Sequence, residues 1–357
     1  MKFIHCADLH LDSKMDGLSS DKAKIRRAEI VNTFENLCNY ATLNGVTAVI
    51  IAGDMFDTAK VTIKTRNSIL HAMAENPSVD FLYLSGNHDE QNFISSLDTL
   101  PENLKVFNDE WTYFNYGNVC IAGVRFTAYN QNNIYDTLNL LPQNLNVAVL
   151  HGQIAGYVGD ENSEIISLPR LKDRNIDYLA LGHIHQYAEG QLDLRGKYAY
   201  SGCLEGRGFD ETGDKGFILI DVDKEINFKF VKFSQRNMVN FEYDITNKPD
   251  WLFARTEILN YLSNNVSNKN LVKVIIKGQR KPSFDIDILG LSIKLNQTFF
   301  FAKVYDKTEI QVEEADYLHD KSLRGEFVRT VWESALSIEE KTKVLTLGLN
   351  ALKGEEI

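Results

Sequence analysis

The sequence predicts a layered α/β domain, followed by a smaller α+β domain and two C-terminal helices. Short apolar runs alternate with segments of helical periodicity up to about residue 233, and a polar segment then separates this alternation from a second, shorter one. The length of 357 residues suits about two domains of ~150 residues each. Hydrophobic residues make up 44% and charged residues 24%, which excludes collagen-like, disordered and disulfide-scaffold classes.

In the first domain, predicted over 1–234, runs of four to six residues rich in Val, Ile, Phe and Tyr indicate buried strands. A helix is predicted over Asp21–Asn44, where apolar residues recur at helical spacing and Gly45 follows. A second helix is predicted over Thr62–Glu75, ending before Pro77. The predicted strands are Phe3–Ala7, Ala48–Ala52, Phe81–Leu84, Val119–Val124, Val147–Leu150, Tyr178–Leu181 and Phe217–Val222.

A domain boundary is predicted at Ser234–Asp250, a polar segment with three Asn and one Pro that breaks the strand pattern. Beyond it we expect a small domain over 250–312 and C-terminal helices over 318–357. The last helix begins with Ser337 and Glu340 at the spacing of a capping box, which satisfies two free backbone amides. The elements predicted for the small domain are a helix at Trp251–Leu262, a strand at Leu271–Lys277, a helix at Asp285–Leu295 and a strand at Thr298–Tyr305.

The cysteines, the apolar runs and the net charge indicate the cellular location and exclude some kinds of site. The four cysteines form no CxxC pair, so we expect neither a zinc ribbon nor a disulfide framework, and we expect a reducing, cytoplasmic location. No apolar run approaches the ~18 residues of a membrane span, and the N-terminus lacks the apolar core of a signal peptide. The net charge of −11 argues against a surface that binds nucleic acid everywhere, but it is compatible with a local basic groove.

Five of the eight histidines follow directly on predicted strands, each accompanied by Asp, Asn or Gly. Because sites in α/β sheets are built from loops at the carboxyl ends of strands, we expect these side chains to meet. Carboxylate, imidazole and amide ligands without cysteine suit Mn²⁺, Fe²⁺ or Zn²⁺ better than a closed structural zinc site. Two such ions, bridged by a carboxylate at roughly 3.5–4 Å, would clamp a phosphate. The five are His10, His88, His151, His183 and His185.

Each motif alone has an ordinary explanation. A lone DxH or HxH pair is common, and GNHD alone is compatible with a simple turn. His5 lies in a predicted strand and His71 on a predicted helix, and we expect both to be structural. The conjunction of five such pieces, all at strand ends, is what predicts a dinuclear phosphoesterase site.

The order DxH, GDxxD, GNHD, H and GHxH, from Asp8 to His185, resembles the calcineurin-like metallophosphoesterase superfamily. The resemblance implies a two-sheet sandwich flanked by helices. It places His88 near the leaving group and assigns Asp57 to orienting that histidine, since a carboxylate on one ring nitrogen raises the basicity of the other. It also implies one ion held by Asp8, His10, Asp54 and His185, and a second held by Asp54, Asn87, His151 and His183, with Asp54 as the bridge.

A narrower resemblance is carried by MKFIHCADLHLDS, GDMFDTA, DYLALGHIHQY and YSGCLEGRGFDETGDKGF, which resemble bacterial DNA-repair exonucleases of the SbcD and YhaO type. Asp57 stands where archaeal and eukaryotic relatives tend to have His, which favours the bacterial branch. The domain after residue 250 resembles the family's DNA-capping domain. The resemblance implies a 3′–5′ exonuclease with single-strand endonuclease activity, working in DNA repair and recombination with an SMC-type ATPase similar to SbcC or YhaN. Mn²⁺ is the first expectation for the metal, with Fe²⁺, Zn²⁺ and Mg²⁺ as alternatives.

Candidate DNA contacts are less specific. Arg207 is a candidate substrate-binding residue, with a turn role as the alternative. Basic clusters are candidates for phosphate contacts, with solvated faces as the alternative. The clusters are Lys22, Lys24, Arg26 and Arg27, then Arg170, Lys172 and Arg174, then Lys277, Arg280 and Lys281.

The last helix is apolar on more than one side, at Val344, Leu345, Leu347 and Leu349. We expect it to pack against the phosphoesterase domain, with docking on the ATPase or in a homodimer as alternatives. Two other functions stay open: a phosphodiesterase of small phosphoesters or nucleotides, and a non-catalytic scaffold for an ATPase. The cap domain and the LEGRGFDE loop argue against the first. The complete ligand set argues against the second, because buried charges are costly without ions.

Overall fold

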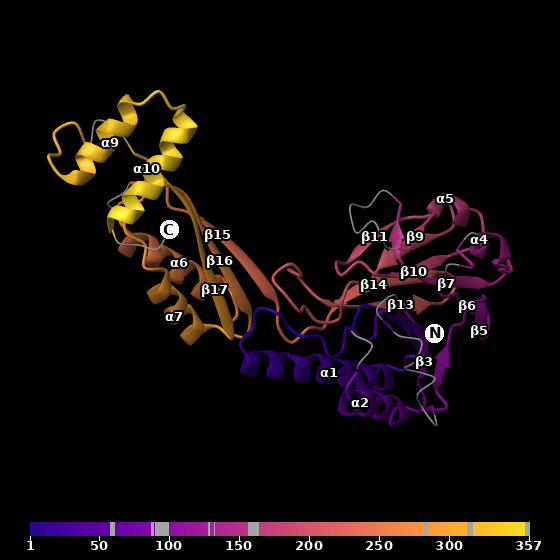
Figure 1. The fold of residues 1–357 in the computed structure, drawn as a ribbon. Coiled ribbons are helices and arrows are strands. Elements are labelled where there is room, and N and C mark those ends of the chain that lie inside the picture. Colours follow the sequence, from indigo (N-terminus) through magenta and orange to yellow (C-terminus); the bar gives the residue numbers. More distant parts are fainter. Residues whose placement is uncertain are drawn as a thin grey trace. The chain divides into compact units, whose positions relative to one another are not determined.

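The computed structural model describes residues 1–57, 61–86, 89, 100–127, 129–131, 133–155, 164–281, 284–312 and 317–353. The chain divides into two compact units, Met1–Asn237 and Met238–Ile357 (Figure 1). No helix within the described ranges is both long enough and apolar enough to span a membrane. The first unit contains every predicted metal ligand.

Two six-stranded sheets form the first unit. The first sheet contains β1 (Lys2–Cys6), β2 (Ala48–Ala52), β3 (Asp80–Leu84), β4 (Leu104–Val106), β13 (Gly216–Val222) and β14 (Ile226–Lys232). The second contains β5 (Thr112–Tyr116), β6 (Val119–Gly123), β7 (Leu145–His151), β10 (Tyr178–Gly182), β11 (Ala188–Gln191) and β12 (Lys197–Tyr200). Two short strands, β8 (Gln153–Ile154) and β9 (Ile165–Ile166), pair with each other.

Each sheet has a parallel centre. The first has the order β14-β13-β1-β2-β3-β4, in which β1 to β4 are parallel. β13 pairs with β1 in antiparallel orientation, and β14 pairs antiparallel with β13. The second has the order β11-β12-β10-β7-β6-β5, with β12, β10, β7 and β6 parallel. Loops that follow parallel strands leave from the same edge of a sheet, which is where the site residues lie.

The two sheets pack face to face on an apolar layer. Ile50 and Leu82 of the first sheet and Val149 and Ala180 of the second are fully buried in it. The outer face of the first sheet is covered by α1 (Ser20–Leu43) and α2 (Ile63–Ala74), which lie side by side (Figure 1). The short helices α4 (Ile134–Thr137) and α5 (Leu168–Leu171) cover the second sheet. This arrangement confirms the predicted sandwich flanked by helices.

All seven strands predicted for this unit are present, with ends that differ by no more than two residues. Both predicted helices are present as well, and the Thr62 hydroxyl caps α2 by accepting from the Thr65 N–H. The sequence did not predict β4, β5, β11, β12 and β14 of the two six-stranded sheets. The residues of β11 and β14 alternate between half-buried and exposed, so neither strand forms an apolar run.

The second unit is a three-stranded parallel sheet with helices between its strands. It contains β15 (Met238–Asp244), α6 (Trp251–Asn265), β16 (Leu271–Arg280), α7 (Ile288–Thr298) and β17 (Phe301–Ile310). The prediction that Ser234–Asp250 breaks the strand pattern is wrong from Met238 onward. β15 is an edge strand whose alternate residues, such as Glu242, face solvent, so it resembled a polar linker.

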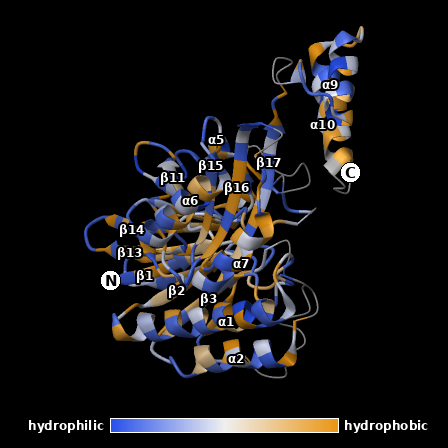
Figure 2. Ribbon diagram, turned by 90° about the vertical axis from the view of Figure 1, so that its left-hand side faces the viewer, coloured by the Kyte–Doolittle hydropathy of each residue, from blue (hydrophilic) through white to orange (hydrophobic). Residues whose placement is uncertain are grey.

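The chain continues into two further helices, α9 (Leu323–Glu333) and α10 (Ile338–Lys353), both with hydrophobic segments (Figure 2). The predicted capping box is confirmed: the Ser337 N–H donates to Glu340 Oε2 at 2.9 Å, and the Glu340 N–H donates to Ser337 Oγ at 3.3 Å. Leu345 and Leu349 are buried together with Val328 of α9. It is therefore α9 that buries this side of the last helix, where the sequence favoured packing on the phosphoesterase domain.

Arg26 is a correction to the predicted basic cluster on the first helix. It is fully buried, and its guanidinium contacts Glu29 at 2.6 Å and Glu205 at 2.8 Å. The same guanidinium donates to the carbonyl of Gly206 at 2.8 Å, and the Thr33 hydroxyl donates to Glu205. Arg26 therefore fastens α1 to the loop after β12 and is not available to DNA.

We expect Arg26→Ala to lower the free energy of unfolding by about 3–5 kcal/mol, because it leaves the buried Glu205 carboxylate without its cation. Urea unfolding measures the change. The exposed Lys24 on the same helix provides the control, and Lys24→Ala should unfold near the wild-type midpoint. A loss below about 1 kcal/mol for Arg26→Ala would contradict this account.

Candidate metal centre

The predicted ligands stand at the carboxyl ends of four parallel strands drawn from both sheets. Asp8 and His10 follow β1, Asp54 follows β2, His151 ends β7, and His183 and His185 follow β10. Asn87 and His88 lie outside the described residues. The described ligands gather into two groups, each with ligand atoms within 4.8 Å of one another: Asp8, His10 and His185 in the first, and Asp54, His151 and His183 in the second.

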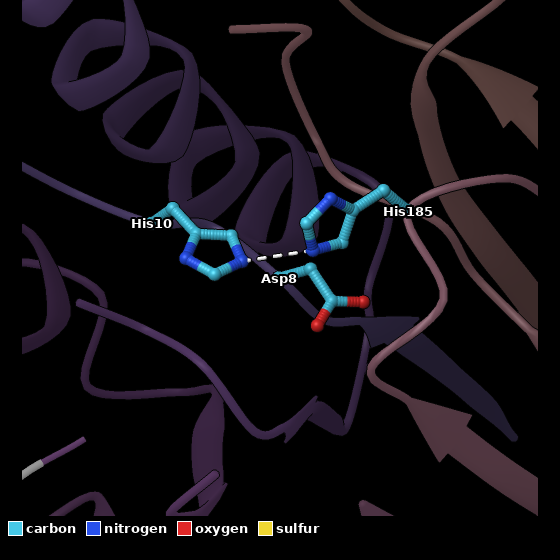
Figure 3. A group of neighbouring side chains, drawn as sticks. All are labelled: Asp8, His10 and His185. Carbon is cyan, nitrogen blue, oxygen red and sulfur yellow. Dashed lines mark hydrogen bonds between the residues drawn. The ribbon is translucent and has the colours of Figure 1, made fainter. Parts of the chain in front are cut away.

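In the first group, the rings of His10 and His185 meet edge-on beside the Asp8 carboxylate, with their Nε2 atoms directed at each other (Figure 3). Their Nε2 atoms lie 3.0 Å apart. The Asp8 carboxylate also accepts the backbone N–H of His183, at 2.9 and 3.1 Å to its two oxygens. Two imidazole nitrogens and a carboxylate thus converge on one point from two different sheets.

In the second group, Asp54 Oδ2 lies 3.3 Å from His151 Nε2 and 3.8 Å from His10 Nε2 of the first group. Asp54 is therefore within reach of both groups, as the predicted bridging role requires. His151 Nδ1 lies 2.9 Å from the carbonyl oxygen of Ala52. Since a carbonyl can only accept, Nδ1 carries the hydrogen and Nε2 is directed to the site.

Several ligand residues hold an unusual backbone conformation. Asp8, His10, Asp54 and His183 have positive φ angles of 52°, 43°, 50° and 99°. Such a conformation costs about 1–3 kcal/mol for a non-glycine residue and persists only where the surroundings impose it. The strain turns each of these side chains out of its strand direction and into the site.

Two motif glycines make room for ligands. Gly53 has φ +94°, and a Cβ there would lie 2.0 Å from His151 Nδ1. A Cβ on Gly86 would lie 2.2 Å from Asp54 Oδ1. The glycines of the GD and GN motifs are therefore required by the close approach of the ligand side chains.

The charge of the site fits divalent cations. Asp8 and Asp54 are buried, at 0% and 1% exposure. Burial alone would lower the pKa of the His151 ring, but the charge of Asp54, with that of Asp8, raises it to about 10. Burial lowers the pKa of His10 and of His183, so these rings are neutral and ready to bind. Buried carboxylates together with imidazoles are a donor set suited to Mn²⁺, Fe²⁺ or Zn²⁺.

Charged side chains lie close to the Nδ1 atoms of the two histidines in the first group. Glu211 Oε1 lies 2.8 Å from His185 Nδ1, and Asp57 Oδ1 lies 3.2 Å from His10 Nδ1. Arg207 donates to both carboxylates. Burial would raise the pKa of Glu211, but its hydrogen bond with His185 and the charge of Arg207 hold that pKa well below its ordinary value.

Sequence reasoning missed Glu211. It stands in the LEGRGFDE segment, and no regular spacing connects it with His185. The described partners of Asp57 are His10 and Arg207. Its predicted action on His88 and the predicted contact of Arg207 with substrate stay predictions.

Asp89, the last residue of GNHD, has a structural role that the sequence did not indicate. Its buried carboxylate accepts backbone N–H groups from Met55 at 3.1 Å, Phe56 at 2.8 Å and Gly86 at 2.9 Å. Burial raises its pKa to about 6. Asp89 is thereby fixed to Gly86 and to the loop after Asp54.

The two histidines expected to be structural stand apart from the site. His5 is fully buried in β1 and pairs through Nδ1 with the Tyr178 hydroxyl at 2.8 Å. Burial lowers its pKa to about 3, so the ring is neutral. His71 lies exposed on α2.

The fold and site define a phosphoesterase of the calcineurin-like class. Residues 1–187 match the family model described as calcineurin-like phosphoesterase, and the chain belongs to this family. The match confirms the predicted fold class and the predicted class of enzyme.

Among individual relatives, the chain is 28% identical over 246 residues to the uncharacterized metallophosphoesterase YhaO of Bacillus subtilis, covering 64% of this chain and 60% of YhaO. It is 24% identical to the DNA double-strand break repair protein Mre11 of Saccharolobus solfataricus over an alignment of 388 residues, covering 100% of this chain and 96% of that protein. The Mre11 of Methanopyrus kandleri is 24% identical over 270 residues, covering 65% of this chain and 57% of its own length.

We expect metal binding to release a proton from His151. Its pKa of about 10 means that the ring is protonated at pH 7 in the metal-free protein. A metal binds only the neutral ring, so affinity should rise with pH, by up to about tenfold per unit below pH 10. Titration calorimetry with Mn²⁺ in buffers of different ionisation enthalpy should report at least one proton released. The ligand His185 can add to the release, since burial would lower its pKa but the hydrogen bond with Glu211 and the charge of Asp8 raise it overall. His71→Ala should leave the release unchanged, whereas a heat independent of the buffer would contradict the assignment.

Proposed function

We propose that this protein is a two-metal phosphodiesterase that hydrolyses DNA, acting as a Mn²⁺-dependent 3′–5′ exonuclease with single-strand endonuclease activity. The metal chemistry is supported by the two ligand groups and by the position of Asp54 between them. The DNA substrate is supported by the similarity to Mre11, a DNA double-strand break repair protein, along the whole of this chain. That similarity is the observation that carries the proposal.

The proposed ligand assignment is supported by the geometry of the described ligands. Asp8, His10 and His185 would hold one ion and His151 and His183 the other, with Asp54 shared and Asn87 completing the second set. When bound, such ions polarise the scissile phosphate and lower the pKa of an attacking water. The chain positions them by burying the ligands and by fixing the His151 ring through the Ala52 carbonyl.

His88 would act on the leaving group. It follows the proposed ligand Asn87 directly in the GNHD motif, and the neighbouring Asp89 accepts three backbone hydrogen bonds from Met55, Phe56 and Gly86. A protonated imidazole there would give its proton to the departing sugar oxygen, a step worth about 10²–10⁴ in rate. His88 would then be a catalytic residue that binds no metal.

The decisive test is cleavage of end-labelled duplex DNA by the purified protein with Mn²⁺, beside hydrolysis of bis-p-nitrophenyl phosphate. We expect shortening from the 3′ end. His88→Ala should reduce the rate by about 10²–10⁴ and keep its Mn²⁺ content, whereas Asp54→Asn should lose both. His71→Ala, on the exposed helix α2, should behave as wild type.

Turnover of the small diester without any DNA cleavage at low salt, alone and with its ATPase partner, would contradict DNA as the substrate. It would favour a phosphodiesterase of small phosphoesters or nucleotides. Full metal content without hydrolysis of either substrate would favour a non-catalytic scaffold.

We also propose that the affinity of the protein for DNA depends on an SMC-type ATPase similar to SbcC. Several of the candidate basic residues are already engaged: Arg26 is buried, Arg170 and Arg174 pair with Asp136, and Lys277 pairs with Glu242. The net charge of −11, with 38 basic against 49 acidic residues, disfavours the approach of phosphates to the lone chain.

We therefore expect weak DNA binding by the protein alone, with a slope of log K against log salt shallower than about −3. Addition of the ATPase should steepen the slope, since more phosphates are then contacted. Fluorescence anisotropy of a labelled duplex across a salt series measures both. A steep slope for the protein alone would refute the dependence on a partner.

A further inference from the structure

The ligand histidines of the two metal groups have different partners at the ring nitrogen that points away from the metal position. In the second group, His151 is held by a backbone carbonyl, that of Ala52, at the end of β2. In the first group, both imidazoles turn their outward nitrogens to carboxylates. His185 Nδ1 contacts Glu211 at 2.8 Å, and His10 Nδ1 lies 3.2 Å from Asp57.

One side chain joins these two carboxylates. Arg207 Nη1 donates to Asp57 Oδ1 at 2.7 Å, while Nε and Nη2 donate to Glu211 Oε1 at 3.0 and 2.7 Å. The backbone N–H of Arg207 also donates to the other oxygen of Glu211, at 2.6 Å. Because a guanidinium is planar and rigid, it fixes the separation of the two carboxylates.

The loop that carries Arg207 is held in place at both of its ends. The Gly206 carbonyl, directly before Arg207, accepts from the buried Arg26 at 2.8 Å. On the other side of the loop, Lys215 donates to the backbone carbonyl of His185 at 2.7 Å. The Arg207 side chain is only 18% exposed. The loop thus holds Arg207 toward the ligand histidines with little freedom to move.

We propose that Arg207 is a positioning residue for the first metal group and not a substrate contact. Through Glu211 and Asp57 it orients His185 and His10, so that their Nε2 atoms converge beside Asp8. Removal of such outer partners of ligand histidines typically costs 10–100-fold in metal affinity. The inference rests on the proposed ligand assignment and is independent of DNA as the substrate.

The experiment is titration of Mn²⁺ into the metal-free full-length protein, followed by calorimetry and by electron paramagnetic resonance. Wild type should bind two ions that couple magnetically. Arg207→Gln should weaken one site by about 10–100-fold and leave the other unchanged, so that the signal of an isolated Mn²⁺ ion persists at intermediate metal concentrations. Glu211→Gln should give the same selective loss, and it serves as the second variant if Arg207→Gln does not fold.

Arg195→Gln is the matched control. Arg195 binds Asp177 through two hydrogen bonds of 2.9 and 2.8 Å in the same unit, and its described partners include no metal ligand. This variant should bind both ions as wild type does. Its normal behaviour would show that loss of a paired arginine does not by itself disturb the metal sites.

Two outcomes would overturn the inference, and a third would overturn the metal centre on which it rests. Unchanged Mn²⁺ affinity in Arg207→Gln, with a raised KM for bis-p-nitrophenyl phosphate, would make Arg207 the substrate contact that the sequence suggests. Equal weakening of both sites would indicate general loosening of the fold. A wild-type protein that binds fewer than two ions would instead overturn the proposed metal centre itself, which separates the two failures.

Discussion

The structure depends on one electrostatic constraint, the burial of two carboxylates at the meeting edges of two sheets. Asp8 and Asp54 are almost completely excluded from solvent, and burial of an ionised carboxylate without a compensating cation is strongly unfavourable. In the metal-free chain, His151 takes up a proton to provide part of that compensation. Two divalent ions would provide it fully, which is why the strand ends converge with imidazoles rather than with apolar side chains.

Because the ligands come from both sheets, metal binding would also join the two halves of the sandwich. β1 and β2 belong to the first sheet, and β7 and β10 to the second. The strained backbone at Asp8, Asp54 and His183 is compatible with this arrangement, since ions bound only by the folded state repay strain through their binding energy. Even in the metal-free chain, Glu211 contacts the outward ring nitrogen of His185 at 2.8 Å, and Asp57 lies 3.2 Å from that of His10.

Features carried by local sequence were predictable. The apolar runs ending in Asp8, Asp54 and His183 place these residues at strand ends, and parallel strands bring their ends together. The partners of those ligands were not predictable, since the Ala52 carbonyl and Glu211 reach their histidines through tertiary packing without any periodic spacing. The remaining differences between the sequence predictions and the structure arise from burial. Arg26 resembled a surface charge, and the alternating edge strand β15 resembled a linker.

In the proposed metal centre, one chain holds two ions with Asp54 between them. Anomalous diffraction from crystals soaked in Mn²⁺ would locate both ions. We expect two peaks roughly 3.5–4 Å apart, one beside Asp8, His10 and His185 and the other beside His151 and His183, with the Asp54 carboxylate touching both. A single peak, or two peaks that do not share Asp54, would contradict this proposal.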